Sequence, residues 1–340
     1  MSVQRFTIGV ATPEGLGAPY AYFTPAITQG FDRSEGLAFE FFGGGEPGAT
    51  ARALCAGACD IACLNTIVGF MGRANEDLPM VAIGSKARRE HRYFAVPAAS
   101  PITALAELEG KRIACDFPHI QPLAEAALAE EGVPARSFTW RPWQGSGMEI
   151  AGMVEPLRAG AIDALFIMDW TDGDAVARGI ALRHLRSRLF DRIRVSSCYW
   201  TTEKRLAADP DTLGRALRAI QKSLVFSFAN PGAALRAMWR SHPATAPAAA
   251  ARDAASAHDI EILKACLEPM RIAADDSDPR WCAIPAAEMA AWQAFLHDAG
   301  SIRRPVDLER LYTTALIARA NDFDPEPIRA AARRNEQGGN

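Results

Sequence analysis

Short apolar runs alternate with amphipathic stretches over the first two-thirds of the chain. Each run has the length of a buried strand, and most of the stretches between them have the apolar spacing of a helix. Strands that alternate with helices predict parallel α/β sheets, in which each helical crossover covers a sheet face. The predicted strands are Phe6–Val10, Leu37–Phe42, Asp60–Leu64, Met80–Ile83, Tyr93–Val96, Arg112–Ala114, Phe138–Trp140, Ala164–Ile167 and Val195–Tyr199.

The last third has a different pattern, with apolar residues at the helical period. They form one stripe from Thr212 to Phe228, and Asp209-Pro210 before it suits a helix start, because aspartate caps and proline fits the first turn. We therefore expect a helical C-terminal part. Further helices are predicted after Asn230-Pro231, around Ile260–Leu267, after Pro285 and over Leu308–Leu316.

Charge and composition argue against two classes of function. The 340 residues carry 37 basic and 40 acidic side chains, a formal net charge of −3, whereas a dedicated nucleic-acid binder has a marked basic surplus. The sequence has no apolar run of the roughly 18 residues that a membrane span requires. We expect no nucleic-acid partner and no membrane insertion.

The start of the sequence bears on the compartment. Met1–Arg5 lead directly into the predicted strand Phe6–Val10, without the apolar stretch and small-residue cleavage site of a secretory signal. Two compartments stay open: the periplasm if a signal peptide is missing from this sequence, and the cytoplasm otherwise. The 7 cysteines, an odd number without disulfide-scaffold spacing, favour a reducing compartment.

Cys55, Cys59 and Cys63 have the regular spacing of a metal motif. A metal site needs ligands that converge on one point. The segment around Cys55 reads as a helix and Asp60–Leu64 as a buried strand, and this change of structure would direct the thiols apart. We therefore expect buried structural cysteines. We expect no metal and no cofactor, and assign no catalytic residue.

Four segments carry motifs whose order and spacing are informative together. In these segments the chain resembles the binding proteins of nitrate, sulfonate, taurine and thiamine-pyrimidine-precursor importers, which have the type II periplasmic binding protein fold. The resemblance covers most of the chain. The segments are Gly30-Phe31 with Glu35-Gly36-Leu37; Ala53-Leu54, Gly57 and Asp60-Ile61; Pro101-Ile102, Leu105, Leu108 and Gly110–Ile113; and Leu157, Gly160 and Ile162–Ala164.

The resemblance implies a two-lobed α/β fold, with two mixed sheets flanked by helices and a helical C-terminal part. Residues 1–95 and 200–340 would form the first lobe and 96–199 the second, with a ligand cleft between them. Two crossing strands near Tyr93–Pro97 and Cys198–Trp200 would form the hinge. The implied function is that of a monomeric substrate-binding component of an ABC-type importer, with the permease as protein partner.

Candidate ligand-binding residues follow from the rule that ligands bind outside the carboxyl ends of the strands in open α/β sheets. Buried carboxylates among them require donors, and aromatic rings can stack on a flat ligand. We therefore expect a small amine, heteroaromatic or hydroxyl-rich molecule rather than a simple anion. The candidates are Thr12, Glu14, Tyr20, Asn65, Thr66, Asp116, His119, Ser146, Asp169 and Trp170.

An enzyme on the same scaffold is the alternative, with Asp116 and His119 as its reactive groups and Cys115 beside them. The fold also resembles aryl-sulfinate desulfinases, a dihydroxyphthalate decarboxylase and the thiamine-pyrimidine synthase. Desulfinases have their nucleophilic cysteine in the first loop, whereas residues 11–20 here contain none. The synthase has a cysteine cluster at the second hinge crossing, where this chain has only Cys198. The sequence therefore favours binding over catalysis.

Overall fold

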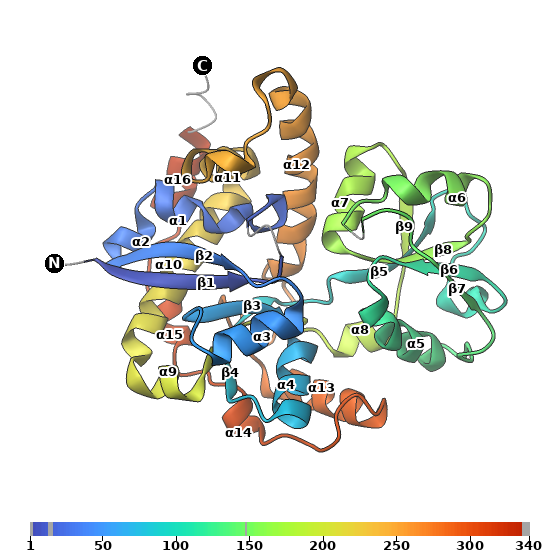
Figure 1. The fold of residues 1–340 in the computed structure, drawn as a ribbon, viewed down its shortest axis with the longest axis horizontal. Coiled ribbons are helices and arrows are strands. Elements are labelled where there is room, and N and C mark those ends of the chain that lie inside the picture. The colour runs from blue at the N-terminus through green and yellow to red at the C-terminus, as the bar shows by residue number, and fades with distance from the viewer. Residues whose placement is uncertain (1–2, 13–15, 147, 335–340) are drawn as a thin grey trace. The chain divides into compact units, whose positions relative to one another are not determined.

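The computed structural model describes residues 3–12, 16–146 and 148–334, without the side chains of His119 and Ala249. The chain divides into two compact units (Figure 1). The first comprises Met1–Arg88, Val195–Ser256 and Met270–Asn340, and the second Arg89–Arg194 and Ala257–Pro269. The segment Ala257–Pro269 therefore belongs to the second unit, whereas we expected everything from residue 200 onward in the first lobe.

The first unit contains a five-stranded sheet in the order β2-β1-β3-β10-β4. Its first three strands in this order are parallel, and β10 runs antiparallel to both of its neighbours. The predicted fold class, with mixed sheets, is confirmed, and the purely parallel pairing that alternation alone indicated is wrong. The strands are β1 Gln4–Val10, β2 Leu37–Gly43, β3 Ile61–Asn65, β4 Met80–Ala87 and β10 Ser197–Thr202.

The second unit contains a five-stranded sheet in the order β7-β6-β8-β5-β9. The strand β6 is parallel to β7 and β8, whereas β5 is antiparallel to β8 and β9. The edge strand β9 was not predicted, because its four residues alternate too weakly to stand out. The strands are β5 Arg92–Pro97, β6 Arg112–Cys115, β7 Thr139–Arg141, β8 Ala164–Met168 and β9 Leu182–Leu185.

Helices of the first unit include the predicted long C-terminal ones. The helix α10 begins where expected, because the carboxylate of Asp209 accepts a hydrogen bond from the amide of Thr212 at 3.0 Å. The first unit's helical elements are η1 Ala18–Phe23, α1 Pro25–Thr28, α2 Phe31–Ser34, α3 Pro47–Cys55, α4 Thr66–Glu76, α9 Glu203–Ala208, α10 Pro210–Ala229, α11 Pro231–Ser241, η5 Pro243–Thr245, η6 Ala249–Ala251, α13 Ala286–Asp298, α14 Leu308–Leu311, α15 Ile317–Ala320 and α16 Glu326–Arg334.

The predicted fifth C-terminal helix is interrupted. Tyr312 leaves the helix in an extended conformation and forms an isolated bridge with Ala82 of β4, so α14 and α15 are separate short helices. The apolar residues of Leu308–Leu316 are thus spaced as buried residues are, but the prediction of one continuous helix is wrong.

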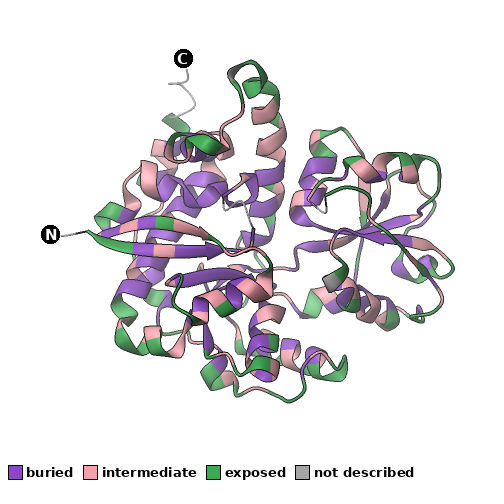
Figure 2. Ribbon diagram, in the orientation of Figure 1, coloured by how far each residue is buried: buried purple, intermediate pink, exposed green. Residues whose placement is uncertain are grey.

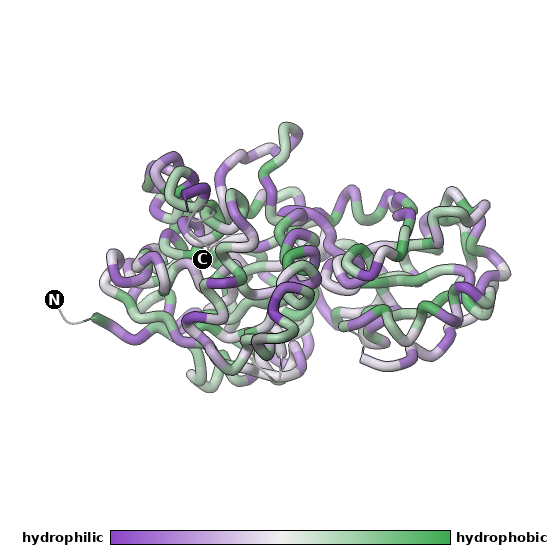
Figure 3. Tube along the Cα trace, turned by 90° about the horizontal axis from the view of Figure 1, so that it is seen from above, coloured by the Kyte–Doolittle hydropathy of each residue, from purple (hydrophilic) through white to green (hydrophobic). Residues whose placement is uncertain are grey.

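Helices of the second unit surround its sheet, and the inner strands of both sheets are mostly buried (Figure 2). Hydrophobic stretches run through the interior of each unit, and the outer loops are more hydrophilic (Figure 3). The helical elements are η2 Leu105–Leu108, η3 Pro118–Ile120, α5 Gln121–Glu130, η4 Ala151–Met153, α6 Val154–Arg158, α7 Asp169–Ala177 and α8 Arg188–Arg192, with most of α12 Arg252–Leu267 and of η7 Glu268–Met270.

The helix α12 packs closely on α7. A Cβ atom on Gly173 would lie 2.6 Å from the Cα atom of Ile262, so the contact requires glycine. The buried carboxylate of Asp174 accepts a hydrogen bond from His258 at 2.7 Å and another from Arg178 at 2.8 Å. These contacts explain why a segment from the C-terminal third belongs to the second unit.

Four of the motif residues have structural roles at helix ends and strand entrances. Gly57 and Gly160 follow α3 and α6 with φ angles of 84° and 62°, in the left-handed region that glycine adopts at little cost. The carboxylate of Asp60 accepts a hydrogen bond from the amide of Thr7 at 2.8 Å. Asp163 likewise binds the amide of Arg112 at 2.8 Å. Each aspartate therefore joins the entrance of its own strand to the neighbouring strand of the sheet.

Candidate functional site

One edge of the first sheet gathers the ends of all five strands. Val10, at the end of β1, pairs with Gly43 of β2 and Cys63 of β3. Ser197, at the start of the antiparallel β10, pairs with Asn65 at the end of β3 and Ala87 at the end of β4. The carboxyl ends of four strands and the amino end of β10 therefore share this edge.

Two rings and a cation lie at this edge. The ammonium nitrogen of Lys86 lies 5.8 Å from the ring centroid of Tyr20 and 5.9 Å from that of Tyr22. Both distances permit cation–π attraction. Lys86 is half-buried, and Tyr20 and Thr12 are buried. The edge thus combines an ammonium group with aromatic walls.

Asn65 and Thr66 differ in what they can offer a ligand. The hydroxyl of Ser197 donates to the side-chain oxygen of Asn65 at 3.0 Å, and Asn65 remains half-buried. The hydroxyl of Thr66 is fully buried and donates to the carbonyl of Val195 at 2.6 Å. Thr66 therefore joins the start of α4 to the segment before β10, whereas Asn65 and Ser197 present a polar pair at the edge.

The corresponding edge of the second sheet is organised around Asp116, which follows β6. One oxygen of its carboxyl group accepts a hydrogen bond from the amide of Met168 at 2.8 Å and another from the hydroxyl of Thr171 at 2.9 Å. Arg92, the first residue of the antiparallel strand β5, pairs in register with Met168 at the end of β8. The register therefore brings Asp116, Arg92 and the start of α7 to one edge.

Three buried polar atoms at this edge have no hydrogen-bonding partner among the described residues. They are Nη1 of Arg92, Oδ1 of Asp116 and Nε1 of Trp170. Arg92 is 1% exposed and Asp116 4% exposed, and the other side of the Arg92 guanidinium is paired with Glu90 at 2.7 Å. Buried polar groups are nearly always paired in native proteins, so these three atoms make the edge a candidate for binding polar groups of a ligand.

Asp169 and Phe117 complete this group. Asp169 begins α7, is buried, and its carboxylate accepts a hydrogen bond from the amide of Trp170 at 2.9 Å. The rings of Phe117 and Trp170 meet edge to face, with centroids 5.9 Å apart. Sequence reasoning thus found Asp116, Asp169 and Trp170, which the structure brings together.

Burial controls the protonation of the ionisable groups here. Desolvation raises the pKa of Asp116 to about 7, against the opposing effect of the hydrogen bonds from Met168 and Thr171. Desolvation also raises the pKa of the neighbouring Cys115 thiol, with a further contribution from Asp116. Cys115 is therefore a thiol rather than a thiolate at neutral pH, which disfavours it as a nucleophile.

The remaining candidates are not brought to this group by any described contact. Glu14 lies outside the described residues. His119 lies in η3, and its side chain is outside the described part of the structure. Ser146 is exposed in the loop after β7, where its hydroxyl accepts a hydrogen bond from the amide of Met148 at 3.2 Å. Their place in the site stays a prediction.

The regularly spaced cysteines lie in different surroundings. Cys55 is half-buried at the end of α3, Cys59 lies against Gly9 of β1, and the Cys63 sulfur is 3.8 Å from the hydroxyl of Tyr22. Burial, with a contribution from Asp60, raises the pKa of Cys59 to about 12. Within the described ranges, no group of three or more potential metal-binding side chains was found.

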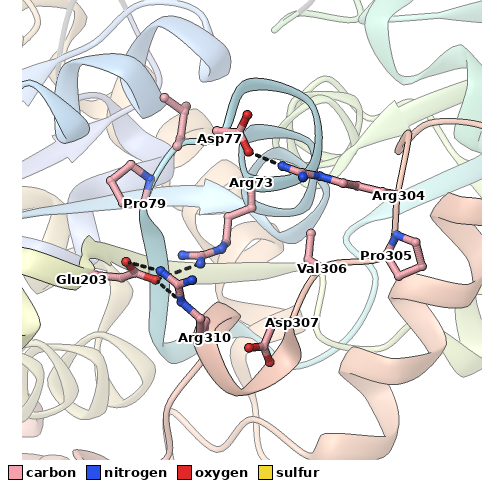
Figure 4. A pocket seen from close by; sticks show the side chains of 10 residues that line it. Arg73, Asp77, Pro79, Glu203, Arg304, Pro305, Val306, Asp307 and Arg310 are labelled. Carbon is pink, nitrogen blue, oxygen red and sulfur yellow. Dashed lines mark hydrogen bonds and ion pairs between the residues drawn. The ribbon is translucent and has the colours of Figure 1, made fainter.

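A pocket of about 290 Å³ in the first unit is lined by ion pairs (Figure 4). Glu203 accepts hydrogen bonds from Arg73 at 2.8 Å and from Arg310 at 2.9 Å, and Arg304 pairs with Asp77. Each of the three arginines among the described lining residues is therefore paired with a carboxylate, and Arg73 and Arg310 share Glu203. These pairs join α4 and α9 to α14 and to the segment before it, so we assign the pocket a structural role.

The sequence of residues 20–234, more than half of the chain, matches the family described as NMT1/THI5 like. The chain belongs to the NMT1/THI5-like family. Among proteins with curated functions, none has a significantly similar sequence. None of the helices in the described part of this NMT1/THI5-like protein is long and apolar enough to cross a membrane.

Solved structures with the same fold as this NMT1/THI5-like protein include binding proteins and an enzyme. The alkanesulfonate-binding protein SsuA from Xanthomonas axonopodis pv. citri has a TM-score of 0.60 and 16% identity over 94% of this chain and 98% of its own. SsuA from Escherichia coli has a TM-score of 0.64 and 15% identity over 90% and 91%. The desulfurization enzyme DSZB has a TM-score of 0.59 and 16% identity over 93% and 98%. The fold expected from the sequence motifs, that of the type II periplasmic binding proteins, is confirmed.

Proposed function

We propose that this chain is the solute-binding component of an ABC-type importer and closes on one small polar or heteroaromatic metabolite. The observation that carries the proposal is the set of buried, unpaired polar atoms on Arg92, Asp116 and Trp170. Leaving a buried donor or acceptor unpaired costs roughly 1–3 kcal/mol. A ligand that pairs with these atoms removes that cost, so their arrangement favours binding.

The chemistry of the second sheet's edge defines the ligand class. Arg92 Nη1 and Trp170 Nε1 are donors. Asp116, with its pKa raised to about 7 by burial, can donate or accept near neutral pH. The set suits a flat ligand that carries several acceptors, such as ring nitrogens, carbonyl groups or a carboxylate.

The similar proteins support a binding role. The solved structure of SsuA from Xanthomonas axonopodis pv. citri contains bound MOPS, and two other similar structures are named as sulfonate-binding proteins. In this proposal the edge of the second sheet supplies ligand-binding groups. The permease of the importer is the proposed protein partner, and the periplasm the proposed compartment.

Native mass spectrometry of the purified protein, incubated with a small-molecule extract of its source cells, tests this function. We expect one metabolite to stay bound and to be recovered chemically unchanged. Trp170→Phe keeps most of the ring surface and removes Nε1, so it should weaken retention. Trp140→Phe is the matched control, because Trp140 Nε1 already donates to Glu125 at 2.8 Å. Retention that is equal in both variants would contradict the proposal.

A second candidate function is an enzyme on the same scaffold that uses Asp116 as a general acid or base. The specific observation in its favour is the pKa of about 7, produced by burial, which matches the range in which such groups work best. The same incubation distinguishes the two functions. Recovery of a converted molecule by the wild type, but not by Asp116→Asn, would favour the enzyme.

A further inference from the structure

A pocket of about 460 Å³ in the first unit has no part in the function proposed above. It is lined by the end of α10, the segment after η7, Trp281 and α16. The volume lies in the range of small-molecule sites. None of the sheet-edge residues discussed above is among the described residues that line it.

The apolar walls of the pocket are held firmly. Trp281 stacks on Phe323 with ring centroids 5.8 Å apart and an angle of 16° between the rings. Its backbone is fixed by Asn321, which accepts from the Trp281 amide at 3.0 Å and donates to the Trp281 carbonyl at 2.9 Å. Phe228 forms a second aromatic wall, and Val225 and Ile272 add aliphatic surface. Walls fixed in this way lose little freedom when a ligand binds.

The polar side of the pocket is cationic. Arg271, Arg329 and Arg333 line it, and no carboxylate is among its described lining residues. The guanidinium carbon of Arg271 lies 4.7 Å from the ring centroid of Phe228. Arg329 pairs with Glu326, which lies outside the lining. The pocket of Figure 4 also has three arginines, but its lining contains their carboxylate partners.

We propose that this pocket binds a small aromatic carboxylate. The ring would lie against Phe228 and Trp281, where stacking is favourable. The carboxylate would be held by the guanidinium groups, whose planar fork matches its two oxygens. The site is separate from the ligand-binding edges and does not depend on their function.

Calorimetric titration with 2-naphthoate at low ionic strength tests the proposal. We expect the double variant Arg329→Gln/Arg333→Gln to raise Kd by about tenfold or more, since charge-assisted pairs contribute at least that much. The neutral probe 2-naphthamide should bind the wild type about tenfold or more weakly for the same reason. The matched control is Arg303→Gln, an exposed arginine of the same unit that does not line the pocket.

Trp281→Phe locates the probe, because quenching of tryptophan fluorescence by 2-naphthoate should largely disappear in this variant. Thermal unfolding of each variant checks that it is folded, and Arg333→Gln alone, at an exposed position, serves if the double variant is not. An unchanged Kd in the arginine variants would overturn the proposal. So would equal binding of the amide, or a Kd that responds instead to Trp170→Phe or Asn65→Ala.

Discussion

Replacement of Asp116 by asparagine gives the sharpest test of the electrostatics at the second sheet's edge. Burial raises the pKa of this carboxyl group from 3.8 to about 7, and the hydrogen bonds from Met168 and Thr171 only partly oppose the rise. Between these pH values the folded protein holds a proton that the unfolded chain has released. The free energy of unfolding that is linked to this group therefore falls as the pH rises through the window.

The magnitude follows from the pKa. At pH 5 the folded group lies two pH units below its pKa of about 7, so ionisation of this site costs about 3 kcal/mol, at roughly 1.4 kcal/mol per unit. At pH 8 this contribution has disappeared. Asparagine does not titrate, so the difference in free energy of unfolding between wild type and Asp116→Asn should change by about 3 kcal/mol between these pH values.

Urea unfolding followed by tryptophan fluorescence at pH 5, 6, 7 and 8 measures this difference. The free energy of unfolding of the wild type minus that of the variant should be larger at pH 5 than at pH 8. Comparison with the variant removes the contribution of other titrating groups, which both proteins share. A difference that stays constant over the range, or that grows in favour of the wild type as the pH rises, would show that the pKa of Asp116 is not raised in the folded protein.

Three further predictions concern other parts of the structure. Gly69→Ala would place a Cβ atom 2.0 Å from the Trp200 ring and should lower the free energy of unfolding in urea by about 1–3 kcal/mol. Gly48→Ala should have a smaller effect, because its new Cβ atom would lie 3.6 Å from the nearest atom, in the Arg52 side chain. Burial works to lower the pKa of His258, but hydrogen bonds to Asp174 and Asp259 outweigh it and raise the pKa. The stability that the protonated imidazole adds to the folded protein is therefore complete below the unfolded pKa and is lost as the pH rises through the folded pKa. Thermal unfolding of His258→Gln should lack this pH-dependent contribution. Burial raises the pKa of Cys198 to about 12, so a thiol reagent at pH 8 should label the half-buried Cys55 before this cysteine, and equal rates in the native protein would contradict the structure.

The sequence predicted most strands because their apolar runs are long and lie between clear turn residues. The helix starts at Asp209 and Asn230 were also predictable, since both side chains cap their helices through local hydrogen bonds. The edge strand β9 was missed because half of its residues, Arg183 and His184, are polar. The break at Tyr312 depends on a bridge to Ala82, a contact too distant in the sequence for a local pattern to reveal.

The candidate site could be predicted only in part from the sequence, for a topological reason. Searching after the carboxyl ends of strands found Asp116, Asn65 and Trp170. It missed Arg92 and Ser197, because these residues begin antiparallel strands whose amino ends lie at the same edges. A single sequence does not reveal which strands run antiparallel. We chose the ligand class from the balance of carboxylates and hydrogen-bond donors in the loops. That balance also changed, since Arg92 adds donors that the loops alone did not supply.

The most direct measurement is a ¹H–¹⁵N spectrum of the indole groups of the 7 tryptophans, recorded with and without the metabolite that the purified protein retains. Trp170→Phe and Trp140→Phe assign the two relevant signals. Our account predicts that the Trp170 Nε1–H signal shifts strongly on binding, because this buried donor acquires an acceptor, and that the Trp140 signal stays in place. A bound metabolite that leaves the Trp170 signal unmoved would contradict the account.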